Sequence, residues 1–480
     1  MIPHRVELII DNEQIATSAY AEIRDPGRFR DVVGLAAQAD ADHVERAVAS
    51  AQRAFGAWRL TAPEERFERL EAMARLIEAR AADLTPLVVA ETGMLPAEIA
   101  AEVAGSAFAT RDNIEAARGF LPASVFEDEA SWVSVEKRPV GVIAAFAPWN
   151  APIVLLIRKL APALACGNTV VVKTPPTAPL GQAVLLGEIA ALFPAGVINV
   201  IHGGDAVGAA LVAHPVVRKI SFTGGGKVAS AIMAAAADTM KGVQFELGGN
   251  DPAIVLDDLD LDRAVPTLVA GAFHRSGQFC FAIKRIYVPE ALHYRFFDAM
   301  AAEVDRFRVG HPIDARTSFG PVNNQRQFEH VRGLADRAAR AGAAVVELGA
   351  AVEPETWDEG YYLRPALVRG AERKAEIVTC EQFGPIVPIL TYRDETEALA
   401  LANDTEYGLG SSIWSSDGDR AHRFAGGIEA GMTFINRNAQ SRLGRRYMPF
   451  GGVKQSGIGT ENSELGLADY VEYHAINVHK

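Results

Sequence analysis

The chain has 480 residues, a formal net charge of −13 and 49% hydrophobic residues, a composition typical of a soluble globular protein with two or three domains. The acidic balance disfavours binding to nucleic acid or to anionic membranes. The three cysteines are far apart and provide no disulfide framework. The first residues show no apolar stretch behind a basic start, so we expect no signal peptide, and no apolar run reaches the roughly 18 residues that span a bilayer. We therefore expect a cytoplasmic protein.

Two amphipathic helices are predicted early in the chain. In residues 41–58, apolar side chains recur at helical spacing, with charges on the opposite face. A second helical pattern covers 63–84, and Pro63 followed by two glutamates matches the usual start of a helix.

Short apolar runs rich in Val and Ile follow, each separated from the next by a helical stretch. The first group lies at 140–148, 168–175, 196–203 and 218–224, and the second at 252–258, 284–288, 343–348, 385–392 and 411–416. This alternation predicts parallel βαβ units, and fully apolar strands imply sheets that are covered on both faces. The sequence thus predicts an α/β fold with two α/β domains.

Two further segments, 131–140 and 470–478, alternate like partly exposed strands that need partners. The acidic run at 257–262 spaces its aspartates like the start of a calcium loop. It lacks the glycine and the distal glutamate of such a loop, so a solvated helix start is the better interpretation.

Several motifs bear chemical groups, although each has an ordinary structural alternative. Glycines 224–226 follow a strand and precede a helix, where backbone N–H groups could hold a pyrophosphate, and Lys173 ends another strand. Glu246 stands among apolar residues and glycines, where burial would raise its pKa and make it a usable general base. Asn150 could donate to an oxyanion, or could simply cap a turn. Taken alone, Cys280 is better explained as a buried core residue.

The order of these motifs resembles that of the aldehyde dehydrogenase superfamily over essentially the full chain. The matching stretches are "PWN", "GNTVVVK", "GVINVIHGG", "ISFTGG", "FELGGN", "GQFC", "EQFGP" and "PFGGVKQSG". The separation between Glu246 and Cys280, 280 − 246 = 34 residues, is also similar to that of the family.

The resemblance implies a role for each matching residue. Cys280 would be the nucleophile, Asn150 would stabilise the oxyanion, and Glu246 would activate the water that hydrolyses the thioester. NAD or NADP would be the cofactor, and no metal is implied. The cofactor residues would be Pro148, Trp149, Lys173, Thr177, Gly204, Gly208, Phe222, Thr223, Gly224, Gly225, Val228, Leu247, Glu381 and Phe383. The substrate pocket would contain Leu155, Arg158, Phe279, Phe281 and Phe450.

The family fold implies a Rossmann-type cofactor domain, an α/β catalytic domain and a small β oligomerisation element. We place them at 1–119 with 140–248, at 249–455, and at 120–139 with 456–480, respectively. The segments 131–140 and 470–478 would then pair across subunits of a homodimer or homotetramer.

Departures from the family pattern leave the cofactor and the substrate open. Pro176 stands where many NAD-preferring members carry a glutamate, so NAD, NADP or both are expected. Arg158 stands where many members have a tryptophan. Together with His274, Arg275, Arg437, Arg442, Arg445 and Arg446, it suggests a basic entrance for a semialdehyde or an aromatic aldehyde, unless these residues are solvated or paired. The alternatives to an aldehyde-oxidising enzyme are a CoA-acylating dehydrogenase and a non-catalytic protein on the same scaffold.

Overall fold

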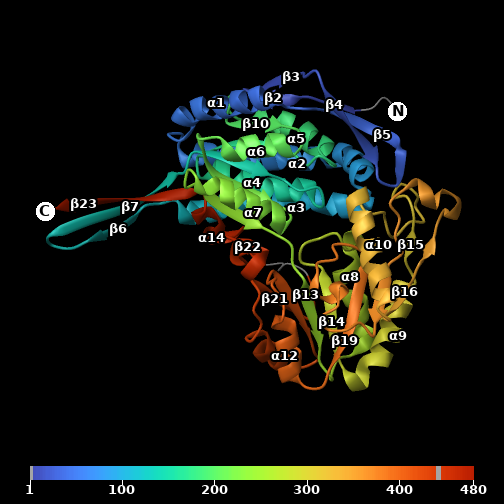
Figure 1. The fold of residues 1–480 in the computed structure, drawn as a ribbon. Helices are drawn as coiled ribbons and strands as arrows, with labels where there is room; N and C mark the ends of the chain where they lie inside the picture. The colour runs from blue at the N-terminus through green and yellow to red at the C-terminus, as the bar shows by residue number, and fades with distance from the viewer. Residues whose placement is uncertain (1–3, 439–444) are drawn as a thin grey trace.

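The structure is a computed structural model that describes residues 4–438 and 445–480. Two α/β halves lie one above the other, and a thin β arm projects from the upper half (Figure 1). The predicted α/β fold is confirmed. Among the described residues, no helix combines the length and the apolarity that crossing a bilayer requires.

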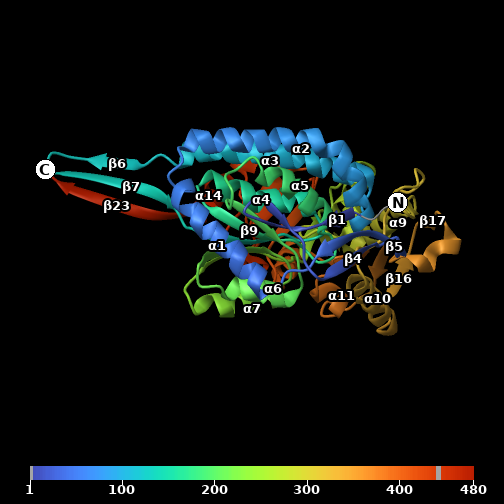
Figure 2. The same cartoon turned by 90° about the horizontal axis from the view of Figure 1, so that it is seen from above.

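The two predicted N-terminal helices are present. Helix α1 (Ala41–Trp58) begins after Asp40, whose side chain accepts the backbone N–H of His43 and thereby caps the helix. Helix α2 (Pro63–Thr92) begins at the predicted proline. It packs against α3 (Pro96–Phe120) across the upper half of the molecule (Figure 2).

The upper half contains an eight-stranded sheet, which we call the first sheet, in the order β22-β12-β11-β8-β9-β10-β2-β3. Its central strands are parallel and almost entirely buried, as their unbroken apolar sequences predict. The strands are β2 (Leu8–Ile10), β3 (Glu13–Ile15), β8 (Val142–Phe146), β9 (Thr169–Lys173), β10 (Ile198–Ile201), β11 (Val217–Thr223), β12 (Gly242–Glu246) and β22 (Gly457–Ile458). The connecting helices are α4 (Pro152–Ala165), α5 (Leu180–Ala190), α6 (Asp205–Ala213) and α7 (Gly226–Ala237).

The lower half contains a seven-stranded sheet, which we call the second sheet, in the order β16-β18-β19-β14-β13-β20-β21. All neighbouring strands are parallel except β16 and β18. The strands are β13 (Asp251–Val255), β14 (Ile283–Pro289), β16 (Ala344–Glu347), β18 (Ala366–Arg369), β19 (Ile386–Tyr392), β20 (Gly410–Trp414) and β21 (Met432–Ile435). The helices are α8 (Leu261–Phe273), α9 (His293–Val304), α10 (Gln325–Arg340), α11 (Glu376–Thr379), α12 (Glu395–Asn403) and α13 (Gly418–Ala425).

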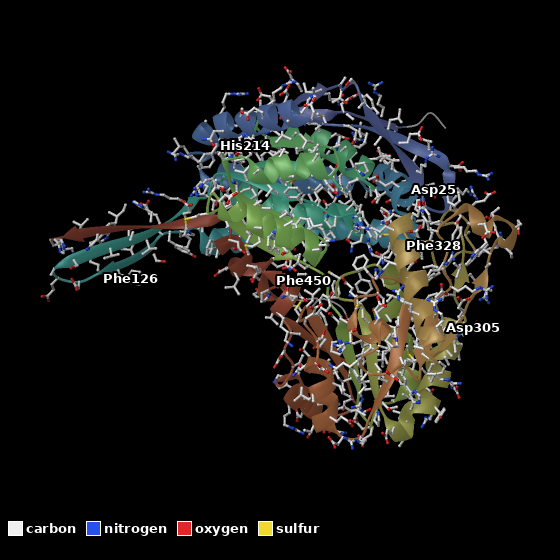
Figure 3. All side chains as sticks on the ribbon, in the orientation of Figure 1. Asp25, Phe126, His214, Asp305, Phe328 and Phe450 are labelled. Carbon is white, nitrogen blue, oxygen red and sulfur yellow. The ribbon has the colours of Figure 1, made fainter. Side chains whose placement is uncertain are left out.

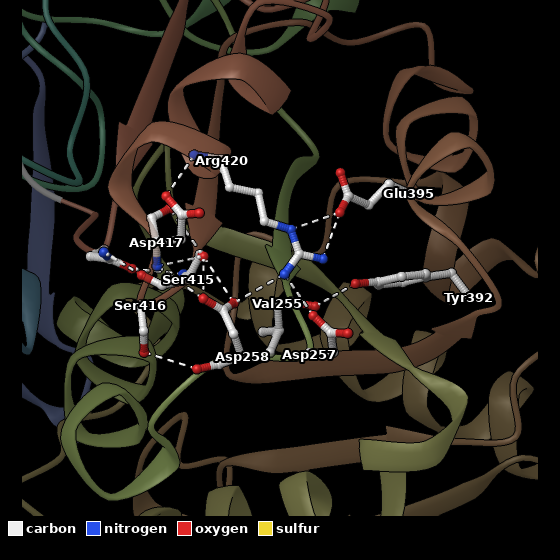
Figure 4. A network of polar contacts seen from close by, with 10 residues as sticks. Val255, Asp257, Asp258, Tyr392, Glu395, Ser415, Ser416, Asp417 and Arg420 are labelled. Atoms are coloured by element: carbon white, nitrogen blue, oxygen red, sulfur yellow. Dashed lines mark hydrogen bonds and ion pairs between the residues drawn. The ribbon is translucent and has the colours of Figure 1, made fainter.

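The carboxyl ends of β13 and β20 are closed by a polar network (Figure 4). Arg420 pairs with Asp257 at 2.7 Å and with Glu395 at 2.6 Å. The carboxylate of Asp258 accepts the Ser415 hydroxyl at 2.9 Å. The acidic run at 257–262 is a helix start, as predicted, because Asp260 caps α8.

The projecting arm corrects one expectation. Strand β7 (Ser131–Pro139) pairs antiparallel with β23 (Val471–His479) over nine residues of the same chain, and β6 (Ser124–Glu127) covers the other edge of β7. The two segments at 131–140 and 470–478 therefore partner each other rather than lacking a partner within the chain. Figures 1 and 2 both show this arm extending away from the two halves, with the C-terminus near its tip.

Candidate active site

The carboxyl edge of the first sheet carries four of the predicted site segments. Asn150 follows β8, Lys173 ends β9, Thr223 ends β11 and Glu246 ends β12. Because these strands are parallel neighbours, their carboxyl ends meet at one edge, where ligands of such sheets commonly bind.

The second sheet presents its amino edge to the same region. Cys280 lies in the turn before β14, and Glu381 and Phe383 lie in the turn before β19. These two turns touch at Gly277 and Gly384. A Cβ on Gly277 would lie 2.4 Å from the carbonyl oxygen of Gly384, and the φ of Gly277 is +73°. Glycine is therefore needed at 277, both for space and for conformation.

Two cavities meet at Cys280. The first has a volume of about 350 Å³ and is lined by Pro148, Trp149, Asn150, Leu155, Thr223, Gly224, Gly225, Glu246, Leu247, Gly248, Cys280, Arg326, Gln327, His330, Glu381 and Phe383. The second has a volume of about 490 Å³ and is lined mainly by α3, α4, α8 and the turn that holds Phe279 and Phe281. Both cavities include Asn150, Leu155 and Cys280, so two molecules could approach the thiol from different sides.

The thiol of Cys280 is protonated at rest. Burial raises its pKa to about 12, and Lys284 is the strongest of the nearby charges that oppose this rise. A base or a bound ligand must therefore help to form the thiolate, which is the nucleophilic form.

Glu246 has the buried setting expected of a general base. Its side chain is 3% exposed, and neither carboxyl oxygen has a hydrogen-bond partner among the described residues. Burial, followed by the nearby carboxylate of Glu461, raises its pKa well above the ordinary value. Glu461 is itself paired with the buried Lys159 at 3.1 Å. The predicted rise in the pKa of Glu246 is confirmed.

Asn150 is held beside the turn that carries Cys280. Its side-chain amide donates to the carbonyl oxygen of Gln278 at 3.0 Å, and its own carbonyl accepts Arg275 Nη1 at 2.7 Å. The amide has a second N–H, which is the group that an oxyanion at Cys280 would need.

The first cavity and the neighbouring carboxyl edge of the first sheet together have features that fit a dinucleotide. The hydroxyl of Thr223 is buried without a hydrogen-bond partner among the described residues, and so is that of Thr177. A Cβ on Gly225 or Gly226 would meet nothing within 4 Å, so there is open space at the start of α7, where backbone N–H groups can bind phosphate. Burial lowers the pKa of Lys173 to about 8.

The predicted cofactor residues fall into two groups. Pro148, Trp149, Thr223, Gly224, Gly225, Leu247, Glu381 and Phe383 line the first cavity. Six others are not part of that lining: Lys173, Thr177, Gly204, Gly208, Phe222 and Val228. Lys173 lies against Gly208 farther along the same edge of the sheet, Phe222 packs beneath Gly224 in the core, and Val228 is exposed on α7.

Four of the five predicted pocket residues line the second cavity: Leu155, Arg158, Phe279 and Phe281. The fifth, Phe450, is 2% exposed and lies behind Phe281, with ring centroids 5.7 Å apart. Figure 3 shows Phe450 between the two halves of the molecule. Arg158 stacks over the Phe450 ring at 5.0 Å.

The predicted basic entrance is partly paired with acidic side chains. Arg275 pairs with the buried Glu102 at 2.6 Å, and His274 lies 3.1 Å from Glu98. Arg437 lines the cavity, and Arg446 stacks on Tyr447 at the surface. Arg442 and the side chain of Arg445 lie outside the described residues. Arg158 is more loosely paired than Arg275: its Nε is buried without a hydrogen-bond partner among the described residues, and its nearest carboxylate, Glu461, is 3.9 Å away.

Sequence reasoning missed three kinds of residue at this site. Arg326, Gln327 and His330 line the first cavity from α10, but on an amphipathic helix they resemble any solvent-facing residues. Glu98 and Glu102 reach the second cavity from α3, far away in the sequence. Lys159 could have been noticed from the sequence, because it and Arg158 are two adjacent basic residues inside the otherwise apolar helix α4.

Comparison with known proteins agrees with this geometry. The model of the aldehyde dehydrogenase family matches residues 15–476. Aldehyde dehydrogenase LUC3 from a Fusarium species is 36% identical over 437 residues, which cover 91% of each chain. Among solved structures, an E. coli NADP-dependent enzyme shares 32% identity at a TM-score of 0.94 and covers 99% of this chain and 98% of its own. Betaine aldehyde dehydrogenase from Staphylococcus aureus, in complex with NAD+, shares 29% identity at a TM-score of 0.94 and covers 98% of this chain and 94% of its own. This chain belongs to the aldehyde dehydrogenase family, whose enzymes oxidise aldehydes with NAD or NADP.

Proposed function

We propose that the protein oxidises an aldehyde to the carboxylic acid through a thioester on Cys280. The observation that carries the proposal is the meeting of two cavities at this thiol, one with the features that fit a dinucleotide and the other lined by apolar rings. As part of the proposal we keep the domain boundaries given above and a homodimer or homotetramer as the assembly.

In the proposed mechanism, the Cys280 thiol releases its proton to solvent through water, and the resulting thiolate attacks the aldehyde carbon and forms a tetrahedral thiohemiacetal. The Asn150 amide and the backbone N–H of Cys280 stabilise the negative oxygen. The bound cofactor supplies the acceptor for the hydride that leaves this carbon. Glu246 then takes a proton from water, the water attacks the thioester carbon, the C–S bond breaks and the acid leaves. Both NAD and NADP remain candidates, since the two solved relatives differ in the cofactor that their names carry.

For the substrate we propose an aldehyde with a carboxylate or another anionic group, with an aromatic aldehyde as the second candidate. The carboxylate is favoured by Arg158, a largely buried cation that lines the second cavity. An aromatic ring is favoured by Phe279 and Phe281, whose ring centroids are 5.1 Å apart beside the thiol.

The test is the formation of reduced nicotinamide from succinic semialdehyde, benzaldehyde and hexanal, each with NAD and with NADP. If the carboxylate proposal is right, kcat/KM is highest for the semialdehyde, and Arg158→Leu lowers it selectively by about 1.5–3 kcal/mol of transition-state binding. A preference for hexanal that survives Arg158→Leu would contradict it.

The same assay separates the rival functions. A CoA-acylating enzyme releases an acyl-CoA when CoA is present, whereas retention of Glu246 favours the free acid. Analysis of the products with and without CoA distinguishes these outcomes. A failure of every aldehyde to yield reduced nicotinamide would support a non-catalytic protein.

A further inference from the structure

Lys284 connects the nucleophile turn to the cofactor cavity. It is the second residue of β14 and is 3% exposed. Its ammonium donates to the carbonyl oxygens of Phe279, at 3.2 Å, and of Cys280, and it pairs with the Glu381 carboxylate at 3.2 Å. One buried charge thus contacts both the turn that carries the thiol and a carboxylate that lines the first cavity.

The neighbouring Arg285 does not share this position. Its guanidinium donates to the carbonyl oxygens of Asn250, Leu401 and Ala402. Successive residues of a strand point to opposite faces, so β14 directs Lys284 toward the site and Arg285 toward the core. The contacts of Lys284 are therefore specific to its place on the strand.

Glu381 is also fixed in place by the backbone around it. Its Oε1 accepts the N–H of Gly249 at 3.1 Å. A Cβ on Gly248 would lie 1.9 Å from its other carboxyl oxygen, so a side chain at 248 would displace the Glu381 carboxylate from this position. The carboxylate can therefore approach Lys284 closely while its outer part, which is 19% exposed, faces the cavity.

Four charged groups act on the pKa of Cys280 from the elements around it: Lys284 and Arg158 favour the thiolate, whereas Glu246 and Asp251 oppose it. Glu381 is paired with Lys284. Asp251 begins β13 beside the turn, and burial raises its pKa to about 7. Of the charges that favour the thiolate, Lys284 has the largest effect on the Cys280 pKa.

We propose that Lys284 is a positioning residue that fixes the Cys280 turn against Glu381 and transmits cofactor binding to the thiol. When the ribose hydroxyls of a cofactor donate to Glu381, the ion pair between Glu381 and Lys284 weakens. The Lys284 ammonium then interacts more strongly with the turn that carries Cys280. The inference rests on the proposed function, in which Cys280 is the nucleophile and Glu381 holds the ribose.

The test is the rate at which iodoacetamide alkylates Cys280 in the full-length protein, with the modified residue assigned by peptide mass spectrometry. Lys284→Met keeps the chain length and removes the charge, and Lys284→Arg keeps the charge. The matched control is Lys241→Met, another buried lysine, which lies at the far end of β12 from Glu246. Rates are measured across pH without cofactor and at saturating NAD or NADP.

At a pH below the thiol pKa, Lys284→Met is expected to slow alkylation by about threefold to tenfold. Loss of the positive charge raises the thiol pKa and lowers the fraction of thiolate, and the higher intrinsic nucleophilicity of the remaining thiolate offsets part of this loss. Lys284→Arg is expected to stay near wild type, and Lys241→Met to match it. The ratio of rates with and without cofactor is expected to be higher in wild type than in Lys284→Met, a comparison in which steric shielding by the cofactor cancels.

Steady-state kinetics give a second measurement. Lys284→Met is expected to lower kcat by about tenfold while KM for the aldehyde stays within about threefold, because the thiol is misplaced but the substrate pocket is intact. Equal alkylation rates and equal cofactor responses in wild type and Lys284→Met would overturn the inference.

If Lys284→Met does not unfold cooperatively, Glu381→Gln breaks the same ion pair from a less buried side. It is expected to lose the cofactor response, and a wild-type response would overturn the inference. Failure of the proposed function looks different: wild type would then produce no reduced nicotinamide from any aldehyde, whatever the alkylation rates of the variants.

Discussion

The two sheets of this molecule use opposite edges. The first sheet presents its carboxyl edge to the site, with Asn150 just after β8, Lys173 at the end of β9 and Glu246 at the end of β12. The second sheet presents its amino edge, with Cys280 and Glu381 just before β14 and β19. Its carboxyl edge is instead closed by Arg420 and its acidic partners (Figure 4). The rule that parallel sheets bind ligands at their carboxyl ends therefore holds for one half only.

The difference has a chemical consequence. The carboxyl edge of the first sheet offers glycine-rich turns that lead into helices, which suit phosphate and ribose. The amino edge of the second sheet offers tight turns before strands, and Lys284 contacts both the turn that carries Cys280 and the carboxylate of Glu381. The predictions below test this division from the largest expected effect to the smallest.

Replacement of Cys280 by Ala should have the largest effect. It removes the nucleophile at the amino edge, so we expect kcat/KM to fall by at least about a thousandfold, with little change in Tm. The control is Cys166→Ala in the core at the end of α4, where burial raises the thiol pKa to about 12. That variant should lose stability and keep its activity. Comparable activity in Cys280→Ala and wild type would remove Cys280 from the mechanism.

Glu246→Gln should separate the two chemical halves of the reaction. Glutamine cannot accept a proton from water, so kcat should fall by about 10²- to 10⁴-fold, while one equivalent of reduced nicotinamide per site still forms in the first turnover. Stopped-flow measurement of this burst checks the prediction. A burst that disappears together with kcat would place Glu246 before the thioester rather than after it.

The difference in stability between wild type and Glu246→Gln should depend on pH. The folded-state pKa of Glu246 lies above the unfolded value of about 4.3. As pH rises above the unfolded pKa, the carboxyl ionises more readily in the unfolded chain than in the folded one, which favours unfolding. Tm of Glu246→Gln should therefore exceed that of wild type near neutral pH, and the difference should vanish at about pH 4. A constant difference across pH would contradict the buried setting.

Lys173→Met at the end of β9 should have an intermediate effect. We expect KM for the cofactor to rise by about tenfold, more for NADP than for NAD, because a lysine attracts a 2′-phosphate. In wild type, the pKa of about 8 means that the lysine loses its charge as pH rises through this value, so KM for NADP should rise in the same range. An unchanged KM for both cofactors would place the adenosine elsewhere.

Arg420→Met should have the smallest effect and should mark the closed edge as structural. Loss of its ion pairs should cost about 1 kcal/mol of unfolding free energy, measured by denaturant titration, and kcat/KM should not change. Arg423→Met, an exposed arginine on the same helix α13, should change neither. A drop in activity in Arg420→Met would show that the closed edge communicates with the site.

Much of the architecture could be predicted because local pattern and fold agree. Most of the apolar runs became buried strands, although β16 is partly exposed, and Pro63 and Asp260 mark helix starts as their residue types suggest. The pairing of Arg275 with Glu102 could not be predicted, because it joins segments that are far apart in sequence and depends on tertiary packing. Nor could the sequence rank Lys284 above Arg285, since the strand's alternation and its neighbours decide which one faces the thiol.

The meeting of two cavities at one thiol has a kinetic consequence. A molecule that fills the ring-lined cavity leaves the other route to Cys280 open, and the reverse also holds. Inhibitors built for one cavity should therefore compete with one reactant and not with the other. An inhibitor that competes with both reactants would have to extend from one cavity into the other past Asn150, Leu155 and Cys280.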